Sequence, residues 1–170
     1  ESTEENDSIY SPNSQIGKYS RKVIFRSLKS ILDRFSNEKG NLTILDVGCG
    51  KGTLVDFFLS EGFTEKNIYG IDLSSNRINQ AKTKYPSVNF VNGDALELTD
   101  ITTEFDVITT FDLYSHFISK EEIIKGLKAI SSKLKDTGTF IWYDINTADH
   151  FSPPSNIDSW GFSMEQMKSL

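Results

Sequence analysis

The sequence has little of the chemistry that supports disulfides, metal sites or nucleic-acid binding. Its 170 residues include one cysteine, Cys49, and two histidines. A single cysteine excludes an internal disulfide and favours a reducing, cytoplasmic compartment. Lys and Arg number 18 against 24 Asp and Glu, a net charge of −6, which disfavours binding that neutralises phosphates. No apolar run reaches the roughly 18 residues of a membrane span, and the acidic N-terminus argues against a secretory signal.

The chain does have the length and the alternation that are typical of a single α/β domain. A chain of this size buries a core, since it hides about 70% of its unfolded surface. Residues 1–16 are polar and unpatterned and are expected to form a flexible N-terminal arm, while residues 17–170 are expected to form the domain. The first helix is predicted from Gly17 to Gly40, because apolar residues recur there at helical spacing: Ile24, Leu28, Ile31, Leu32 and Phe35.

Strand-like apolar runs then alternate with helical segments. Such alternation requires crossover connections and predicts a doubly wound, mostly parallel sheet with helices on both faces. Ser74 is placed to cap one helix, and Ser119 with Glu122 forms a capping box for another. The predicted strands are 43–47, 67–71, 88–91, 105–110 and 139–145, and the predicted helices are 52–60, 74–84, 119–135 and a shorter one near 95–101.

A further capping box, Ser163 with Gln166, stands just before the last residue, Leu170. A helix that short is marginal by itself. The strand before it would lie near an open sheet edge, which natural proteins avoid. We therefore expect the sequence to be truncated before the last strands of its sheet.

The most informative segment joins the first predicted strand to the following helix and reads Ile44-Leu45-Asp46-Val47-Gly48-Cys49-Gly50-Lys51-Gly52. Its glycines allow a tight turn and let backbone N–H groups approach a ligand. In a parallel sheet this turn lies at the carboxyl end of a central strand, where ligands bind. The next strand ends at Asp72, 20 residues beyond Gly52. A carboxylate there is placed to accept hydrogen bonds from both hydroxyls of a ribose.

Three separated acidic residues discriminate between ligands. A nicotinamide dinucleotide calls for G-x-G-x-x-G, with its pyrophosphate at a helix N-terminus. Here the spacing is G-x-G-x-G, and Asp46 stands just before it, where a carboxylate repels a pyrophosphate and attracts an ammonium group. Asp94, after the third strand, is able to accept a hydrogen bond from an exocyclic amine such as that of adenine. A nucleoside with an amino-acid tail, such as S-adenosylmethionine, satisfies all three acids.

At these positions the sequence resembles the class I S-adenosylmethionine-dependent methyltransferases. The resemblance covers about residues 20–145 and implies a Rossmann-like methyltransferase fold, whose final antiparallel strand pair has no counterpart here. The matching segments are the first motif at 45–52, the acidic second-strand motif at 69–74, the adenine-side motif at 91–95, the fourth strand at 105–108 and the helix and turn at 127–139.

The resemblance also implies a set of contacts with S-adenosylmethionine. Asp46 would lie near the ammonium group of the methionine tail, and Asp72 would hold the ribose. The remaining implied contacts are Gly48, Cys49, Gly50 and Phe111 for the tail, and Leu73, Asp94 and Ala95 for the adenine. We further expect a lid from the N-terminal region, with Tyr10 or Tyr19 over the cofactor and Arg21 near its carboxylate. A solvated basic helix face is the alternative interpretation.

Methyl transfer from a sulfonium is an in-line displacement, so alignment and exclusion of water carry most of the catalysis. A general base is needed mainly when the acceptor is a hydroxyl. The catalytic candidates follow the fourth strand: His116, Tyr114 and Asp112. The alternative for His116 is packing beside Phe117. Further candidates at the rim of the sheet are Tyr143 and Asp144, while His150 is expected in a covering loop and no metal site is expected.

The sequence thus predicts an enzyme that methylates a small molecule. Residues 142–144 and 69–72 resemble bacterial methyltransferases of glycan and polysaccharide pathways, which favours a sugar or glycan precursor as acceptor. Neither nucleic acid nor membrane is expected as a partner, and the expected state is a monomer or homodimer. Two alternatives stay open: a non-catalytic S-adenosylmethionine-binding regulatory module, and an NAD-dependent oxidoreductase, in which Asp46 and Asp94 would have no role.

Overall fold

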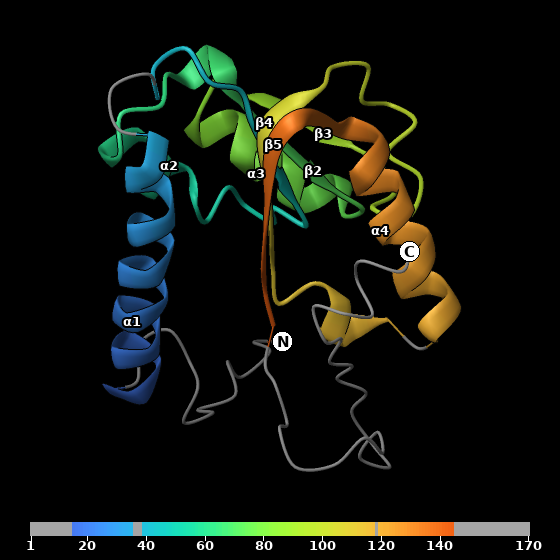
Figure 1. Ribbon diagram of the computed structural model, residues 1–170, viewed down its shortest axis with the longest axis horizontal. Helices are drawn as coiled ribbons and strands as arrows, with labels where there is room; N and C mark the ends of the chain where they lie inside the picture. Colours follow the sequence, from blue (N-terminus) through green and yellow to red (C-terminus); the bar gives the residue numbers. More distant parts are fainter. Residues whose placement is uncertain (1–14, 36–38, 118, 145–170) are drawn as a thin grey trace, which may run out of the picture. The chain divides into compact units, whose positions relative to one another are not determined.

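The structure is a computed structural model that describes residues 15–35, 39–117 and 119–144 (Figure 1). Most of the expected N-terminal arm, the capping box of Ser163 and Gln166, and His150 lie outside the described residues. The chain divides into two compact units, Glu1–Glu38 and Lys39–Leu170.

The first unit contains the helix that the apolar spacing predicts. It runs as α1 (Gln15–Leu32) and continues as the single 3-10 turn η1 (Asp33–Phe35), so it ends before the predicted limit at Gly40. Leu28 and Leu32 are buried, as expected for one face of an amphipathic helix. On the exposed side Lys29 Nζ lies 3.1 Å from Asp33 Oδ1, one turn further along.

The second unit is built on five parallel strands in the order β3-β2-β1-β4-β5. This confirms the predicted doubly wound parallel sheet. The chain first adds strands on one side of β1 and then on the other, which creates a topological switch point between β1 and β4, where α/β sheets bind ligands. The strands are β1 (Ile44–Val47), β2 (Ile68–Asp72), β3 (Asn89–Asn92), β4 (Phe105–Phe111) and β5 (Leu134–Tyr143).

Three helices connect these strands, namely α2 (Val55–Ser60), α3 (Ser75–Lys84) and α4 (Lys120–Lys133). Both expected N-caps are confirmed, because Ser74 Oγ accepts from the Arg77 amide and Ser119 forms its capping box with Glu122. The other short 3-10 turns are η2 (Glu65–Asn67) and η3 (Tyr114–His116). Of the helices that the structure describes, none has the length and apolar character to span a bilayer.

Several sequence-based boundaries differ from the structure, and two of the differences are large. The helix predicted near 95–101 is a series of turns, because the Asp94 carboxylate accepts from the Leu96 amide and Leu98 has a positive φ of 48°, which an α-helix cannot continue. The fifth strand begins at Leu134 and not at Thr139. Leu134 pairs with Phe105, and an irregularity in the β4–β5 register between Phe105 and Val107 accommodates the early start.

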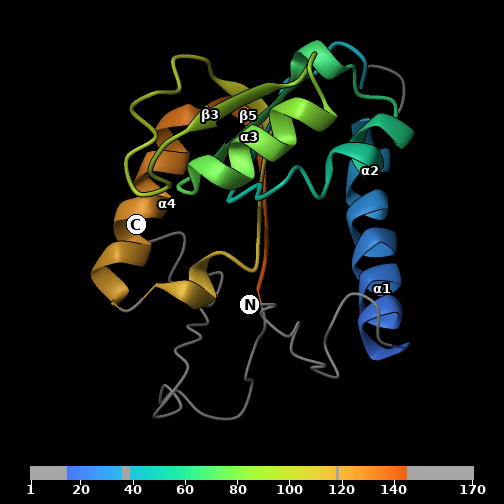
Figure 2. The same cartoon turned by 180° about the vertical axis from the view of Figure 1, so that it is seen from behind.

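Helices cover both faces of the sheet, as predicted. Alternate residues of a strand point to opposite faces. Leu45, Val47, Ile71 and Ile108 share one core with Ile123, Leu127 and Ile130 of α4. On the other face α3 packs against β2 and β3, as Figure 2 shows from behind. Asp46 points to this second face, together with its register partners Gly70 and Thr109.

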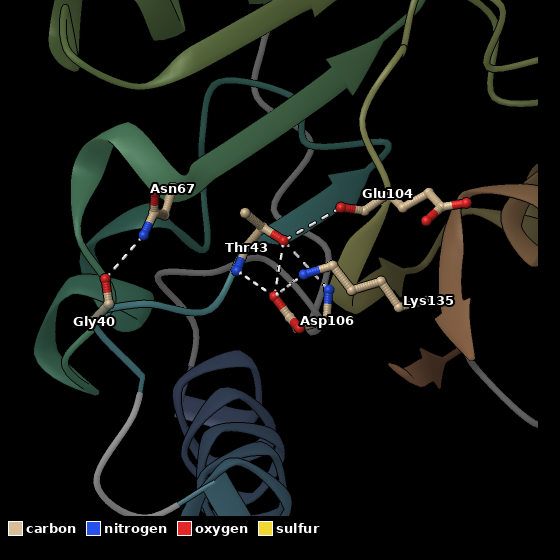
Figure 3. A network of polar contacts seen from close by, with 6 residues as sticks. All are labelled: Gly40, Thr43, Asn67, Glu104, Asp106 and Lys135. Carbon is tan, nitrogen blue, oxygen red and sulfur yellow. Dashed lines mark hydrogen bonds and ion pairs between the residues drawn. The ribbon is translucent and has the colours of Figure 1, made fainter. Parts of the chain in front are cut away.

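A polar network ties the starts of β1, β4 and β5 at the edge of the sheet where β4 begins (Figure 3). Asp106 Oδ2 accepts from the Thr43 amide at 2.8 Å, the Thr43 hydroxyl at 2.9 Å and Lys135 Nζ at 2.9 Å. Partial burial raises the pKa of Asp106, but the hydrogen bonds from Lys135 and Thr43 outweigh it and hold that pKa below its ordinary value. The network therefore stabilises the fold in the ionised state of Asp106.

Substitution of Asp106 by alanine tests this network. Asp106→Ala is expected to lower the free energy of unfolding by about 2 kcal/mol near neutral pH, because the Thr43 amide and the Lys135 ammonium lose their acceptor. Since the pKa is lower in the folded state than in the unfolded state, the contribution is present above about pH 4 and is lost as the pH falls further.

Urea unfolding at neutral and acidic pH measures both effects. The matched control is Asp56→Ala, which removes an exposed carboxylate paired with Lys84 and is expected to change stability by less than about 0.5 kcal/mol. The same loss for Asp106→Ala at both pH values would contradict the ionic origin of the stabilisation.

Candidate functional site

The candidate site lies at the carboxyl ends of β1, β2 and β3, around the glycine turn of residues 48–52. Gly48, Gly50 and Gly52 all adopt positive φ angles, of 80°, 55° and 77°, which only glycine adopts without strain. A Cβ on Gly48 would lie 3.0 Å from Leu113 Cδ1, and one on Gly52 would lie 3.0 Å from a Tyr85 ring carbon. A Cβ on Gly50 would meet nothing within 4 Å. Gly50 is therefore the point where the turn opens outward.

Three backbone amides at the start of this turn donate hydrogen bonds to β2. The Gly48 and Cys49 amides donate to the Ile71 carbonyl at 2.8 and 3.1 Å, and the Gly50 amide donates to Asp72 Oδ2 at 2.9 Å. The amides of Gly48, Cys49 and Gly50 therefore have acceptors within the protein, because β2 runs beside the turn. The open space at Gly50, next to the Asp72 carboxylate, suits a donor group such as an ammonium.

Asp72 connects the glycine turn to the start of α3. Its Oδ2 accepts from the Gly50 amide and its Oδ1 accepts from the Ser74 amide at 2.8 Å. The residue is buried, with 9% of its surface exposed. Each carboxylate oxygen has a second lone pair, so these bonds leave acceptor capacity for the hydroxyls of a ribose.

Asp46 is the most perturbed acid of the site. The residue is 6% exposed, and its Oδ1 accepts from the Thr109 hydroxyl at 2.8 Å. Burial raises the pKa of Asp46 to about 7, with the Thr109 hydrogen bond opposing the shift and the charge of Asp72 adding to it. A carboxyl in this environment gains from a nearby positive charge. Burial beside the two carboxyls also raises the pKa of the Cys49 thiol, so this cysteine is a packing residue and not a nucleophile.

Three residues that shape the site were not found from the sequence. Thr109 is the hydrogen-bond partner of Asp46, and a Cβ on Gly70 would lie 2.8 Å from Cys49 Sγ. Asn92 Nδ2 donates to the carbonyls of Asp72 and Leu73 at 3.0 and 2.9 Å and so holds the end of β2 against the end of β3. Thr109 and Gly70 are register partners of Asp46, and only the strand register identifies them.

The expected adenine-side residues lie around the ends of β2 and β3. Leu73 is 77% exposed, one of two large apolar side chains that are exposed in the described part of the chain. Asp94 is exposed as well, and Ala95 is half-buried. The Asp94 carboxylate accepts from the Leu96 amide, and the Gly93 amide donates to the Asp72 carbonyl at 3.2 Å. An exposed leucine beside an exposed carboxylate suits a flat base with an exocyclic amine.

The predicted catalytic residues follow β4, beside the end of β5. The half-buried rings of Phe111 and Tyr143 stack with centroids 5.6 Å apart. Asp112 has a positive φ of 49°, and its amide donates to the Tyr143 carbonyl. Burial and the charge of Asp144 raise the pKa of Asp112, while His116 opposes the shift. The structure therefore brings Asp112, His116 and Asp144 into one electrostatic neighbourhood.

Tyr114 and His116 have different surroundings within η3. The Tyr114 ring is 1% exposed and packs edge-on against Trp142 and Phe117, whereas His116 is exposed. The Asp144 carboxylate accepts from the Tyr114 amide and from Trp142 Nε1, which fastens η3 to the end of β5. His116 thus remains a candidate for contact with an acceptor, while Tyr114 anchors the segment.

The expected lid residues belong to the N-terminal part of the chain. Tyr19 and Arg21 lie in α1, but their side chains are outside the described part of the chain, as is Tyr10. A role for them at the cofactor stays a prediction.

Comparisons with known proteins identify the family and the fold of the chain. A family model described as a methyltransferase domain matches residues 44–138. A putative methyltransferase, 235L, of Invertebrate iridescent virus 6 is 29% identical over 151 residues, which are 85% of this chain and 55% of that protein. The chain spans about half the length of the curated relatives it matches.

Solved structures share the fold. A structure of an S-adenosylmethionine-dependent methyltransferase from Clostridium acetobutylicum is 27% identical with a TM-score of 0.56, and the match covers 79% of this chain and 54% of that one. CalS10, an amino pentose methyltransferase from Micromonospora echinaspora, is 21% identical with a TM-score of 0.63, over 81% of this chain and 59% of that one.

The role of Tyr114 is testable through its hydroxyl. In the described part of the chain this buried hydroxyl has no hydrogen-bond partner. Tyr114→Phe is therefore expected to leave the free energy of unfolding unchanged or to raise it by up to about 1 kcal/mol. Tyr114→Ala removes the whole ring and is expected to cost about 3 to 5 kcal/mol. Urea denaturation of both variants measures the difference, and a large loss for Tyr114→Phe would contradict an anchoring role based on the ring alone.

Proposed function

The chain belongs to the methyltransferase-domain family, and from this premise we propose that it binds S-adenosylmethionine and transfers its methyl group to a small-molecule acceptor. The observation that carries the proposal is the pair Asp46 and Asp72 beside the open point of the glycine turn at Gly50. Asp46 is buried, and its hydrogen-bond donor is a neutral hydroxyl. This pattern suits a ligand that brings its own positive charge.

The residues present fit such a cofactor. Asp46 would hold the ammonium group of the methionine tail, because it is buried and its donor is the neutral hydroxyl of Thr109. Asp72 would hold the ribose, and Leu73, Asp94 and Ala95 would surround the adenine. A Cβ placed on Gly50 would meet nothing within 4 Å, so there is room beside this residue for the methionine tail.

When bound, S-adenosylmethionine supplies a methyl group attached to a positively charged sulfur, which is an excellent leaving group. The protein then has to align the acceptor with that methyl group and to exclude water. The stacked rings of Phe111 and Tyr143 and the anchored turn η3 lie at the carboxyl ends of β4 and β5. For a hydroxyl acceptor, His116 or Asp112 would take the proton, because both follow β4 beside the end of β5.

We further propose that the acceptor is a sugar or a glycan precursor. Half-buried aromatic rings pack against the apolar faces of sugar rings, and a carboxyl beside them accepts hydrogen bonds from hydroxyl or amino groups. Phe111, Tyr143 and Asp112 provide this combination. The fold is shared with an amino pentose methyltransferase, which supports the proposal of an acceptor of this class.

Ligand binding tests the cofactor assignment. Calorimetric titration with S-adenosylhomocysteine is expected to saturate, whereas NAD is expected to give no specific heat. Asp72→Ala is expected to weaken binding of both S-adenosylhomocysteine and methylthioadenosine by about tenfold to a hundredfold, because both carry the ribose and a hydrogen bond to a charged group contributes about 1.5 to 3 kcal/mol.

The control for this titration is Asp56→Ala, an exposed carboxylate on α2 paired with Lys84, with thermal melts to establish that each variant is folded. Saturation by NAD together with no heat from S-adenosylhomocysteine would overturn the cofactor assignment and favour the oxidoreductase.

The acceptor assignment is tested by transfer of a labelled methyl group to paired hydroxy- and amino-sugars, with a protein that spans the full length of its relatives. On a hydroxyl acceptor, His116→Gln is expected to lower kcat by about a hundredfold or more while leaving the affinity for S-adenosylhomocysteine unchanged. Full activity of His116→Gln would remove this histidine as the base, and the same assay of Asp112→Asn would then test the neighbouring carboxyl.

A further inference from the structure

We propose that Asp46 holds a proton in the free protein and gives it up when the ammonium group of the ligand arrives, so that cofactor binding releases a proton. This inference rests on the proposed function, because it concerns the site of the methionine tail. It goes beyond that function by assigning a proton-coupled step to one residue of the chain.

The first support is the contrast between the two neighbouring carboxyls. Asp72 accepts two backbone N–H bonds, from Gly50 and Ser74, and such donors stabilise an ionised carboxylate. Asp46 is equally buried, but its donor is the hydroxyl of Thr109. A buried carboxyl with so little compensation favours its neutral form until a cation approaches.

The second support is the position of Thr109. Its Oγ1 lies 2.8 Å from Asp46 Oδ1 and 3.5 Å from the Leu45 carbonyl oxygen. When Asp46 is ionised, the hydroxyl donates to its carboxylate. When Asp46 is protonated, the carboxyl O–H donates to Thr109 Oγ1 and the hydroxyl proton turns toward the Leu45 carbonyl. A single side chain therefore satisfies both states of Asp46, since a hydroxyl is donor and acceptor at once.

The third support is the charge of the surroundings. The groups that act on Asp46 from neighbouring elements are the Asp72 carboxyl at the end of β2 and the uncharged Thr109 hydroxyl of β4. Asp46 in turn acts on the Cys49 thiol of the turn. In the described part of the chain no cationic side chain pairs with Asp46. Burial and the charge of Asp72 together raise the pKa of Asp46 to about 7, which is consistent with a proton at this site near neutral pH.

The direction of the pH dependence follows from the proton balance. The O–H bond of the Asp46 carboxyl breaks and the proton leaves to solvent. The resulting carboxylate then forms an ion pair with the ammonium group of the ligand. Below the pKa of Asp46, the affinity for S-adenosylhomocysteine is expected to fall about tenfold for each unit by which the pH is lowered. Above that pKa the affinity is expected to be constant. Methylthioadenosine lacks the ammonium group, so its affinity is expected to stay flat across the same range.

The experiment is isothermal titration of the whole chain with S-adenosylhomocysteine and with methylthioadenosine, in phosphate and in Tris buffer. A difference in heat between buffers of different ionisation enthalpy counts the protons released. Binding of S-adenosylhomocysteine is expected to release about one proton near pH 6 and almost none near pH 8.5. Methylthioadenosine is expected to release none at either pH.

Variants assign the proton to Asp46. Asp46→Asn is expected to abolish the proton release and the pH dependence, and Asp56→Asn, on an exposed carboxylate of α2, is expected to keep both. Thr109→Val removes the stabilising hydroxyl and is expected to move the pH midpoint upward, whereas Thr109→Ser keeps the wild-type midpoint.

A measurement without ligand covers the case in which Asp46→Asn binds nothing. Because folding raises the pKa of Asp46 from 3.8 to about 7, its protonated form stabilises the free protein at low pH. That contribution is lost as the pH rises through about 7. In urea unfolding from acidic to neutral pH, Asp46→Asn is expected to lack this loss relative to the wild type.

The outcomes separate this inference from the proposed function. If S-adenosylhomocysteine binds and no proton is released near pH 6, the proton-coupled step is wrong and the cofactor assignment stands. If S-adenosylhomocysteine does not bind at any pH, the cofactor assignment itself is wrong. Equal proton release by S-adenosylhomocysteine and methylthioadenosine would also overturn the inference, because the coupling would then not involve the ammonium group.

Discussion

The site depends on one hydrogen bond above all, the bond from the Gly50 amide to the Asp72 carboxylate. It closes the glycine turn onto the end of β2, while the same carboxylate also accepts from Ser74 at the start of α3. One buried side chain thereby fixes the relative positions of a turn, a strand end and a helix start. Asp46 lies beside this junction, and its hydrogen-bond donor is the neutral hydroxyl of Thr109. The two carboxyls of the site therefore lack a positively charged partner within the described part of the chain. The proposed ligand is the cation that supplies this charge.

The carboxyl edge of the sheet divides into two halves with different surroundings. Around β1, β2 and β3 the groups are the buried carboxyls of Asp46 and Asp72 and the exposed Leu73, which fit a nucleoside with a charged tail. Beyond β4 and β5 they are the stacked rings of Phe111 and Tyr143, with Asp112 and His116 beside them. The methyl group would pass from the first half to the second. The chain spans about half the length of its curated relatives. The identity of the acceptor at the ends of β4 and β5 therefore stays a proposal.

Much of this was predictable from the sequence, and the reasons for the exceptions are physical. Caps at Ser74 and Ser119 and the glycines of the turn are local signals, so they located helices and the turn correctly. The partner of Asp46 is not local, because Thr109 meets it only through the strand register. The acceptors of the turn's amides are not local either, since they belong to β2. The prediction of a helix over residues 95–101 is wrong, because the hydrogen bond from the Leu96 amide to Asp94 and the positive φ of Leu98 produce turns there.

The most direct test of the central claim is a map of backbone amide chemical shifts during titration with S-adenosylhomocysteine, recorded by NMR on isotope-labelled protein. The amides of Gly48, Cys49, Gly50 and Leu73 are expected to shift most, followed by those of Asp94 and Ala95, while exposed positions of α3 such as Gln80 are expected to stay unchanged. A titration that left the glycine turn unshifted, or whose largest shifts centred on α3, would contradict the claim that the junction of Asp72 and Gly50 is the cofactor site.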